Sequence, residues 1–189
     1  IETWSEIVVS PEDDIELRRV RITNRAKSRR TLELTSYAEV VLTTPAADAM
    51  QTGFSNLFVQ TEIIAAQHAI LCTRRPRSAG DATPWMFHLL SANGGALESV
   101  SFETDRVRFI GRGRSTALPQ AIDAGGALSG TAGSVLDPCV AIRARLTLDA
   151  GQSMTLDWVT GIAGQREACM ELVAKYQDRH LADRVFDLA

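Results

Sequence analysis

Apolar and polar residues alternate with a period of two along much of the chain, which is typical of β-strands with one buried face. The clearest stretch is residues 32–42, where the apolar side chains share one parity and Glu33, Thr35 and Glu39 take the other. This pattern predicts one continuous antiparallel strand whose polar side chains face solvent.

Residues 15–24 also alternate, but the phase of the alternation shifts halfway along, between Leu17 and Val20. One extra residue in a strand produces such a shift, because it moves every later side chain to the opposite face. We therefore predict a β-bulge near Arg18 and Arg19.

The middle of the chain is less regular. Residues 57–73 predict two strands, and residues 85–90, apolar on both faces, predict a fully buried strand. The Asn-Gly-Gly sequence at 93–95 is a hairpin-turn signal, so we expect residues 97–103 to pair with that buried strand. Residues 43–56 are mostly small and predict a loop.

A second hairpin is predicted near the end of the alternating region. Residues 140–148 and 153–158 both alternate, and the tight connection at 149–152 contains a glycine. On the first of these strands, Arg143 and Arg145 fall on the polar parity. We expect both arginines to face solvent.

From Arg166 the apolar residues recur at helical spacing, and Asp178 is a suitable N-cap for a second helix. The overall prediction is an all-β fold, an antiparallel β-sandwich over residues 1–163, followed by a helical segment over residues 164–189.

Residues 104–138 lack a regular period. Four arginines fall within residues 106–114, and Gly111 and Gly113 are interleaved with them. Loops of this length are usually functional or disordered, and the spaced apolar residues argue against disorder. We predict a long structured loop whose arginines are held by carboxylates and carbonyls.

Composition excludes several function classes. The net charge of −3 argues against a nucleic-acid partner, and no stretch is apolar enough to cross a membrane. Cys72, Cys139 and Cys169 are too widely separated for a disulfide framework or a metal site, and the three histidines are equally scattered. We predict no metal and no cofactor, since no phosphate-binding glycine motif is present.

Candidate catalytic groups are few. Glu103, Asp105 and Asp137 offer a carboxylate pair of the kind used in glycoside hydrolysis. Neighbouring arginines, however, lower the pKa of a carboxylate, whereas a general acid needs a raised pKa. Structural ion pairs are the better interpretation, so we predict no catalytic residue and no enzymatic activity for this chain alone.

Five blocks of the sequence resemble a known family. They occur in the order SYAEVVL (36–42), FSNLFVQTE (54–62), RRPR (74–77), FETDRVRFIGRGR (102–114) and LSGTAGSVLDP (128–138). Together they resemble the phosphorylase-like part of cyclic β-1,2-glucan synthases, which is related to glycoside hydrolase family 94. The resemblance covers essentially the whole chain.

The resemblance implies a β-supersandwich similar to galactose-mutarotase-like domains. It implies that residues 164–189 begin a linker to an (α/α) barrel, which carries the catalytic acid and the phosphate site. The parent would lie in the bacterial inner membrane with this domain in the cytoplasm, and the chain would be a soluble piece of it. If preceding strands are missing, the exposed edge makes a homodimer possible.

The resemblance leaves two uses for the charged side chains: they hold the interface with the barrel, which we favour, or they contact β-1,2-glucan or another glucan chain. The candidates are Arg74, Arg75, Arg77, Glu103, Asp105, Arg106, Arg112, Arg114 and Asp137. The alternative function is a self-sufficient carbohydrate-binding module, which requires an exposed aromatic platform. A mutarotase-like enzyme, by analogy of fold, is disfavoured because His68 and His88 lie on unrelated segments.

Overall fold

A computed structural model describes residues 1–76, 78, 80 and 83–189. The strands are β1 (Glu2–Val9), β2 (Ile15–Thr23), β3 (Arg30–Thr35), β4 (Ala38–Glu39), β5 (Val59–Ile64), β6 (Ala69–Arg74), β7 (Trp85–Asn93), β8 (Ser99–Asp105), β9 (Pro138–Leu148) and β10 (Ser153–Ala163). The helices are α1 (Pro45–Asn56), the 3-10 turn η1 (Ala65–Gln67), α2 (Arg106–Ile110), α3 (Gln120–Ala124), α4 (Arg166–Gln177) and α5 (Arg179–Leu188).

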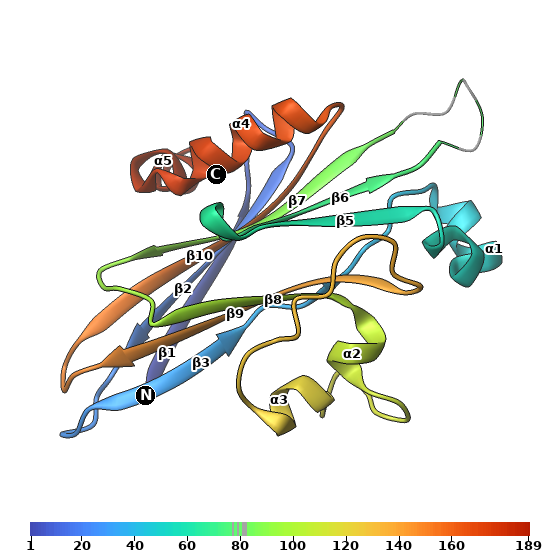
Figure 1. Cartoon of the computed structure of the whole chain (residues 1–189). Coiled ribbons are helices and arrows are strands. Elements are labelled where there is room, and N and C mark those ends of the chain that lie inside the picture. Colours follow the sequence, from blue (N-terminus) through green and yellow to red (C-terminus); the bar gives the residue numbers. More distant parts are fainter. Residues whose placement is uncertain (77, 79, 81–82) are drawn as a thin grey trace.

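Two antiparallel sheets face each other, and helices cover their outer faces (Figure 1). The larger sheet has six strands in the order β1-β2-β10-β7-β6-β5. In the smaller sheet, β3 and β4 follow one another along one edge of β9, and β8 pairs along the other. Helices α4 and α5 lie on the larger sheet, and α2 and α3 lie on the opposite side of the molecule, beside the smaller sheet (Figure 1). This architecture confirms the predicted all-β supersandwich with C-terminal helices.

Three apolar clusters correspond to the three spaces between these layers. The largest lies between the two sheets and includes Ile22, Ile142 and Leu156, which are fully buried. The second lies between the larger sheet and helices α4 and α5. The third contains Phe109 of α2 and packs α2 and α3 against β9. The helices after residue 163 therefore complete one of the cores of the fold.

Both predicted hairpins are wrong, because the strands concerned lie in different sheets. β7 pairs with β6 and β10 in the larger sheet, so neither edge of β7 is left for β8. β8 pairs instead with β9 in the smaller sheet, while β10 lies between β2 and β7. The connections at residues 94–98 and 149–152 each carry the chain from one sheet to the other.

The predicted β-bulge in β2 is also wrong. β2 pairs in unbroken register with β1 and with β10. The phase of its apolar residues shifts because each half of the strand is buried on a different face. Leu17 packs under helices α4 and α5, whereas Val20 and Ile22 face the space between the sheets.

The strand predicted over residues 32–42 is interrupted at Ser36 and Tyr37, which separate β3 from β4. Its apolar parity is nevertheless correct, since these residues face the cluster between the sheets. Ser36 keeps the chain beside β9: its N–H donates to the carbonyl of Ile142 over 3.0 Å, and its Oγ accepts from the Ile142 N–H over 3.2 Å.

The loop predicted over residues 43–56 contains helix α1. Thr44 is its N-cap, with the Thr44 hydroxyl accepting from the N–H of Ala47, and Pro45 occupies its first turn. Both are helix-start signals that the small side chains obscured. The predicted cap of the last helix is confirmed, since Asp178 accepts from the N–H of His180 at the start of α5. None of the helices in the described residues is long and apolar enough to cross a membrane.

Candidate functional site

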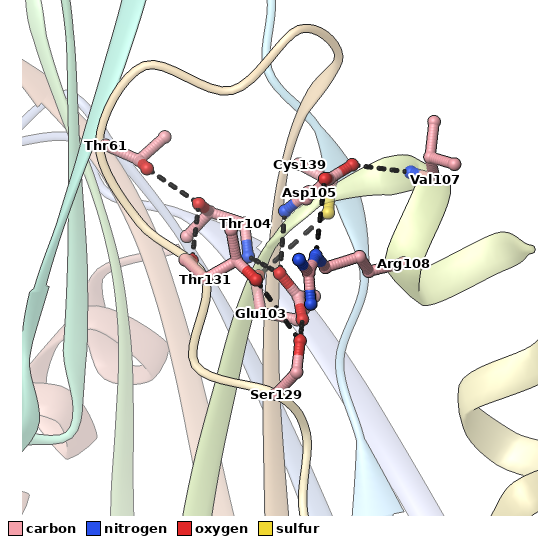
Figure 2. A network of polar contacts seen from close by, with 9 residues as sticks. All are labelled: Thr61, Glu103, Thr104, Asp105, Val107, Arg108, Ser129, Thr131 and Cys139. Atoms are coloured by element: carbon pink, nitrogen blue, oxygen red, sulfur yellow. Dashed lines mark hydrogen bonds and ion pairs between the residues drawn. The ribbon is translucent and has the colours of Figure 1, made fainter.

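Four of the predicted site residues, Glu103, Asp105, Arg106 and Asp137, lie where β8 ends, α2 begins and β9 starts. The pairing of β8 with β9 shifts register between Glu103 and Asp105, which marks a β-bulge. Glu103 is 2% exposed, and its Oε1 accepts the N–H groups of Thr104 and Asp105, each over 2.9 Å (Figure 2). Its Oε2 accepts the hydroxyl of Ser129. The carboxylate therefore satisfies the two amides of the bulge.

The prediction that Glu103 forms a structural ion pair is wrong. Within the described part of the chain, the partners of its carboxylate are two backbone amides and a serine hydroxyl, not an arginine. A carboxylate that accepts several such bonds is held as a fixed acceptor. Glu103 thus has a structural role of a different kind from the one expected.

Thr104 links the same bulge to the larger sheet. Its hydroxyl lies 2.6 Å from the hydroxyl of Thr61 on β5 and donates to the carbonyl of Thr131 over 2.8 Å (Figure 2). Thr61 also exchanges backbone hydrogen bonds with Gly133. The segment before β9 is therefore fixed between the two sheets.

Asp105 starts helix α2. One carboxylate oxygen accepts the N–H of Val107 over 2.9 Å, as an N-cap does, and the other lies 3.8 Å from Nε of Arg108. The helix is a correction, because the glycine- and arginine-rich sequence predicted no regular element here. It ends at Gly111, where φ is +89° and an added Cβ would lie 2.6 Å from Oε1 of Gln120.

Arg106 connects α2 to β4 and to the start of β9. Its Nε donates to Glu39 over 2.8 Å, and its Nη1 lies 3.4 Å from the carboxylate of Asp137. The hydrogen bond from Arg106 lowers the pKa of Glu39, and the same bond raises the pKa of Arg106. Asp137 also accepts from Nδ2 of Asn56 over 3.0 Å, which joins the end of α1 to this network.

Arg74 and Arg75 hold the C-terminal end of α1. Arg74 donates to the carbonyl of Ser55 over 2.8 Å and lies over the ring of Phe58, 5.2 Å from its centroid. Arg75 donates to the carbonyl of Leu57 over 2.9 Å. These are favourable positions for cations, since the last carbonyls of a helix lack partners within it.

The remaining candidate arginines differ from one another. Arg114 pairs with Asp123 of α3 over 2.9 Å, so it holds α3 beside α2. Arg112 is exposed and forms no ion pair among the described residues. Arg77 lies outside the described residues. The long loop is thus structured, as predicted, and Arg106 and Arg114 help to hold it.

Arg143 is a further residue of this region that was assigned wrongly from the sequence. Arg143 is 3% exposed, although its parity predicted a solvent-facing side chain. It donates to Oγ1 of Thr35 over 3.0 Å, to the carbonyl of Ala121 over 2.8 Å and to the carbonyl of Gly126. Helix α3 and its flanking loop cover this outer face of β9, and alternation within one strand carries no information about such a cover.

The arrangement provides carboxylates that are held by hydrogen bonds. The hydrogen bond from Arg106 lowers the pKa of Glu39, which is the opposite of the shift that a general acid requires. Burial raises the pKa of Cys72 to about 12 and that of Cys169 to about 11, and these thiols stay protonated. The described residues contain no group of three or more His, Cys, Asp or Glu side chains suited to a metal ion.

Comparison with known proteins adds the family. The model of the glycosyl hydrolase 94 supersandwich domain matches residues 1–179. The cyclic beta-(1,2)-glucan synthase NdvB of Rhizobium meliloti (strain 1021) is 38% identical over 172 residues, which cover 91% of this chain and 6% of that protein. The chain thus corresponds to a small part of this relative's length. By its fold and by these matches, the chain belongs to the glycosyl hydrolase 94 supersandwich domains.

Proposed function

We propose that this chain is a non-catalytic supersandwich domain of a cyclic β-1,2-glucan synthase, and that it supports an adjoining phosphorylase-like (α/α) barrel of the same polypeptide. The similarity to a protein of that name supports the choice of parent. We place the parent in the bacterial inner membrane with this domain in the cytoplasm, in keeping with the resemblance described above.

The observation that carries the proposal is a group of exposed apolar side chains at the α1 and α2 end of the molecule. Leu136 is 76% exposed and Met50 is 82% exposed. We call the group the apolar end surface; its members are Val41, Met50, Phe54, Leu57, Val107 and Leu136.

The apolar end surface lies over the polar network described above. Leu57 follows Asn56 and Leu136 precedes Asp137, and the side chains of Asn56 and Asp137 are hydrogen-bonded over 3.0 Å. Val107 follows Arg106, which contacts the same Asp137. Leu57, Val107 and Leu136 are therefore held close to one another by the network of Arg106.

A rigid polar base beneath exposed apolar side chains is suited to binding another protein surface. Apolar patches of this kind mark interaction sites, and charged residues are depleted from the cores of interfaces. Because Arg74, Arg75, Arg106 and Arg114 bind groups within this chain, we assign them to building this surface rather than to contacting the barrel or a glucan directly.

The test is to place a charge on the apolar end surface of the full-length synthase. Val107→Asp and Leu136→Asp should detach the domain, because both side chains are exposed here and an acidic residue is tolerated in the first turn of α2. Hydrogen exchange on segments 50–57 and 104–110 should then rise to the level seen in the isolated chain. Unchanged protection in both variants would refute the docking surface.

Ile7→Asp is the matched control. Ile7 is 54% exposed, close to the 55% of Val107, but it lies on β1 at the opposite edge of the larger sheet from α1 (Figure 1). It should leave the exchange of both segments unchanged.

Arg112→Ala separates the two roles considered for the arginines, which are holding the interface with the barrel and contacting the glucan. Altered glucan length with intact docking would assign Arg112 to substrate contact.

A further inference from the structure

A cavity of about 520 Å³ opens between the two sheets, and none of the predicted site residues lines it. The larger sheet contributes Arg18 of β2, His88 of β7 and Trp158 of β10, and the interruption between β3 and β4 contributes Ser36 and Tyr37. Its volume lies within the range of about 300–1,000 Å³ that is typical of small-molecule sites.

The cavity exists because the smaller sheet does not cover the whole inner face of the larger one. Ile7 and Val9 of β1 pair with Arg18 and Glu16 and therefore share their face of the sheet. Ile7 is 54% exposed and Val9 is 67% exposed, so this edge of the inner face is open to solvent.

The base of the cavity is fixed by a polar network that joins the sheets. His88 is 5% exposed, and its Nε2 lies 2.8 Å from the hydroxyl of Ser36 on the smaller sheet. Its Nδ1 lies 2.8 Å from the hydroxyl of Thr160 on β10. Burial lowers the pKa of His88 to about 4, so the imidazole is neutral at physiological pH. Both ring nitrogens are engaged in these hydrogen bonds, so His88 positions the two sheets at the base of the cavity and has no ring nitrogen left for a ligand.

Trp158 supplies an unused donor. The residue is 6% exposed and lines the cavity, yet its indole Nε1 has no acceptor among the described residues. A buried N–H without a partner is costly, and most buried polar groups have one. A ligand oxygen would remove this cost if side-chain motion brought it within reach of Nε1.

The charges at the opening cancel. Arg18 and Glu16 lie 3.4 Å apart, and their side chains are 52% and 48% exposed. Arginine is a donor only, with five N–H groups, and glutamate is an acceptor only. A ligand with hydroxyl groups satisfies both, because each hydroxyl donates and accepts. A strongly charged ligand would favour one and be repelled by the other.

We infer that this cavity binds a neutral polyhydroxylated ligand of one or two sugar rings, with Trp158 and Arg18 as donors, Glu16 as acceptor and the side chains of Val20 and Leu34 as an apolar wall. The choice of a β-1,2-linked sugar rests on the proposed function. The cavity and the chemistry of its walls are independent of that function.

The test is calorimetric titration of the 189-residue chain with sophorose, the β-1,2-linked glucose disaccharide. Saturable binding is expected, together with a shift of the Trp158 indole N–H resonance. Trp158→Phe and Arg18→Gln should each weaken binding about three- to tenfold, the effect of one lost hydrogen bond. Trp4→Phe, 51% exposed on the other face of β1, is the matched control and should bind normally.

Three outcomes would overturn the inference: no binding of any sugar to the folded chain, binding that both Trp158→Phe and Arg18→Gln leave unchanged, or binding of inorganic phosphate instead of sugar. Arg18→Gln keeps the test decisive if Trp158→Phe fails to fold, because the Arg18 side chain is half-exposed. If cellobiose binds and sophorose does not, with the same sensitivity to both variants, the sugar site stands and the β-1,2-glucan parent is refuted.

Discussion

Replacing Glu103 tests whether its carboxylate acts as a fixed acceptor for the bulge at the end of β8. In Glu103→Ala the buried amide of Thr104 and the partly buried amide of Asp105 lose their acceptor, and an unsatisfied buried amide costs about 1–3 kcal/mol. The partly buried amide of Asp105 costs less, so the two together amount to about 2–5 kcal/mol. Removing a buried charge recovers some desolvation energy. We therefore expect the free energy of unfolding to fall by about 2–4 kcal/mol.

Glu103→Gln is the matched comparison. Its amide oxygen can still accept both N–H groups, and its NH₂ can donate to the hydroxyl of Ser129. The expected loss is about 1 kcal/mol, because the bonds become neutral while their number is kept. The two variants therefore separate the position of the acceptor from its charge.

The assay is equilibrium urea unfolding followed by circular dichroism, with m-values compared to exclude a change in the unfolded state. Amide exchange at Thr104 and Asp105 should accelerate in Glu103→Ala alone. A loss below about 0.5 kcal/mol with both amides still protected would refute the reasoning. Equal losses in the two variants would mean that the charge, not the acceptor position, stabilises the bulge.

Three further predictions concern His88 beside the cavity, the buried ion pair of Arg19 with Asp157, and the edge of the larger sheet. Burial lowers the pKa of His88 from 6.5 to about 4, so the stability that the neutral imidazole contributes is complete above pH 6.5. This contribution declines by roughly 3 kcal/mol toward pH 4, because the unfolded chain takes up the proton first. NMR titration of His88 checks the pKa, and urea unfolding checks the pH dependence of stability, which His88→Gln should lose. Arg19→Met leaves the fully buried carboxylate of Asp157 without the guanidinium that donates to it twice over 2.7 Å, so unfolding should become about 3–5 kcal/mol easier, and adding Asp157→Asn should recover part of the loss. Because β1 is an edge strand with exposed apolar side chains, any homodimer should form there, and Ile7→Lys should shift sedimentation toward the monomer.

Each of these three has a result that would contradict it. A His88 ring that titrates near 6.5 would show that the imidazole is solvated. An Arg19→Met chain as stable as the wild type would show that Asp157 has another partner or takes up a proton. A dimer that persists in Ile7→Lys would place the interface away from β1.

Much of the strand content could be predicted, because alternation reports which side chains are buried. It could not report which layer buries them, and this explains several errors. Leu17 and Val20 of β2 are buried on opposite faces, which the pattern alone cannot distinguish from a bulge. Arg143 lies on the expected outer face, but α3 and its flanking loop cover it.

The role of the candidate site residues stays a prediction, but some of their contacts could be anticipated. A cluster of arginines and acids in one loop indicates ion pairs, and Arg106 and Arg114 do form them. The partner of Arg106 on β4, Glu39, lies 67 residues away, and spacing along the chain cannot identify it. The cavity beside His88 was missed for the same reason, since its walls come from β2, β7, β10 and the break after β3.

The position of β10 has a consequence for synthesis of the chain. β10 is made after the other strands of the described residues, yet it lies between β2 and β7 and joins the two halves of the larger sheet (Figure 1). β9, made just before it, has the same place in the smaller sheet. The smaller sheet lacks its joining strand until residue 148 has left the ribosome, and the larger sheet until residue 163 has left, so their unpaired edges are exposed to misassembly until then. Folding should therefore be late and slow, as expected when most pairings are distant in sequence.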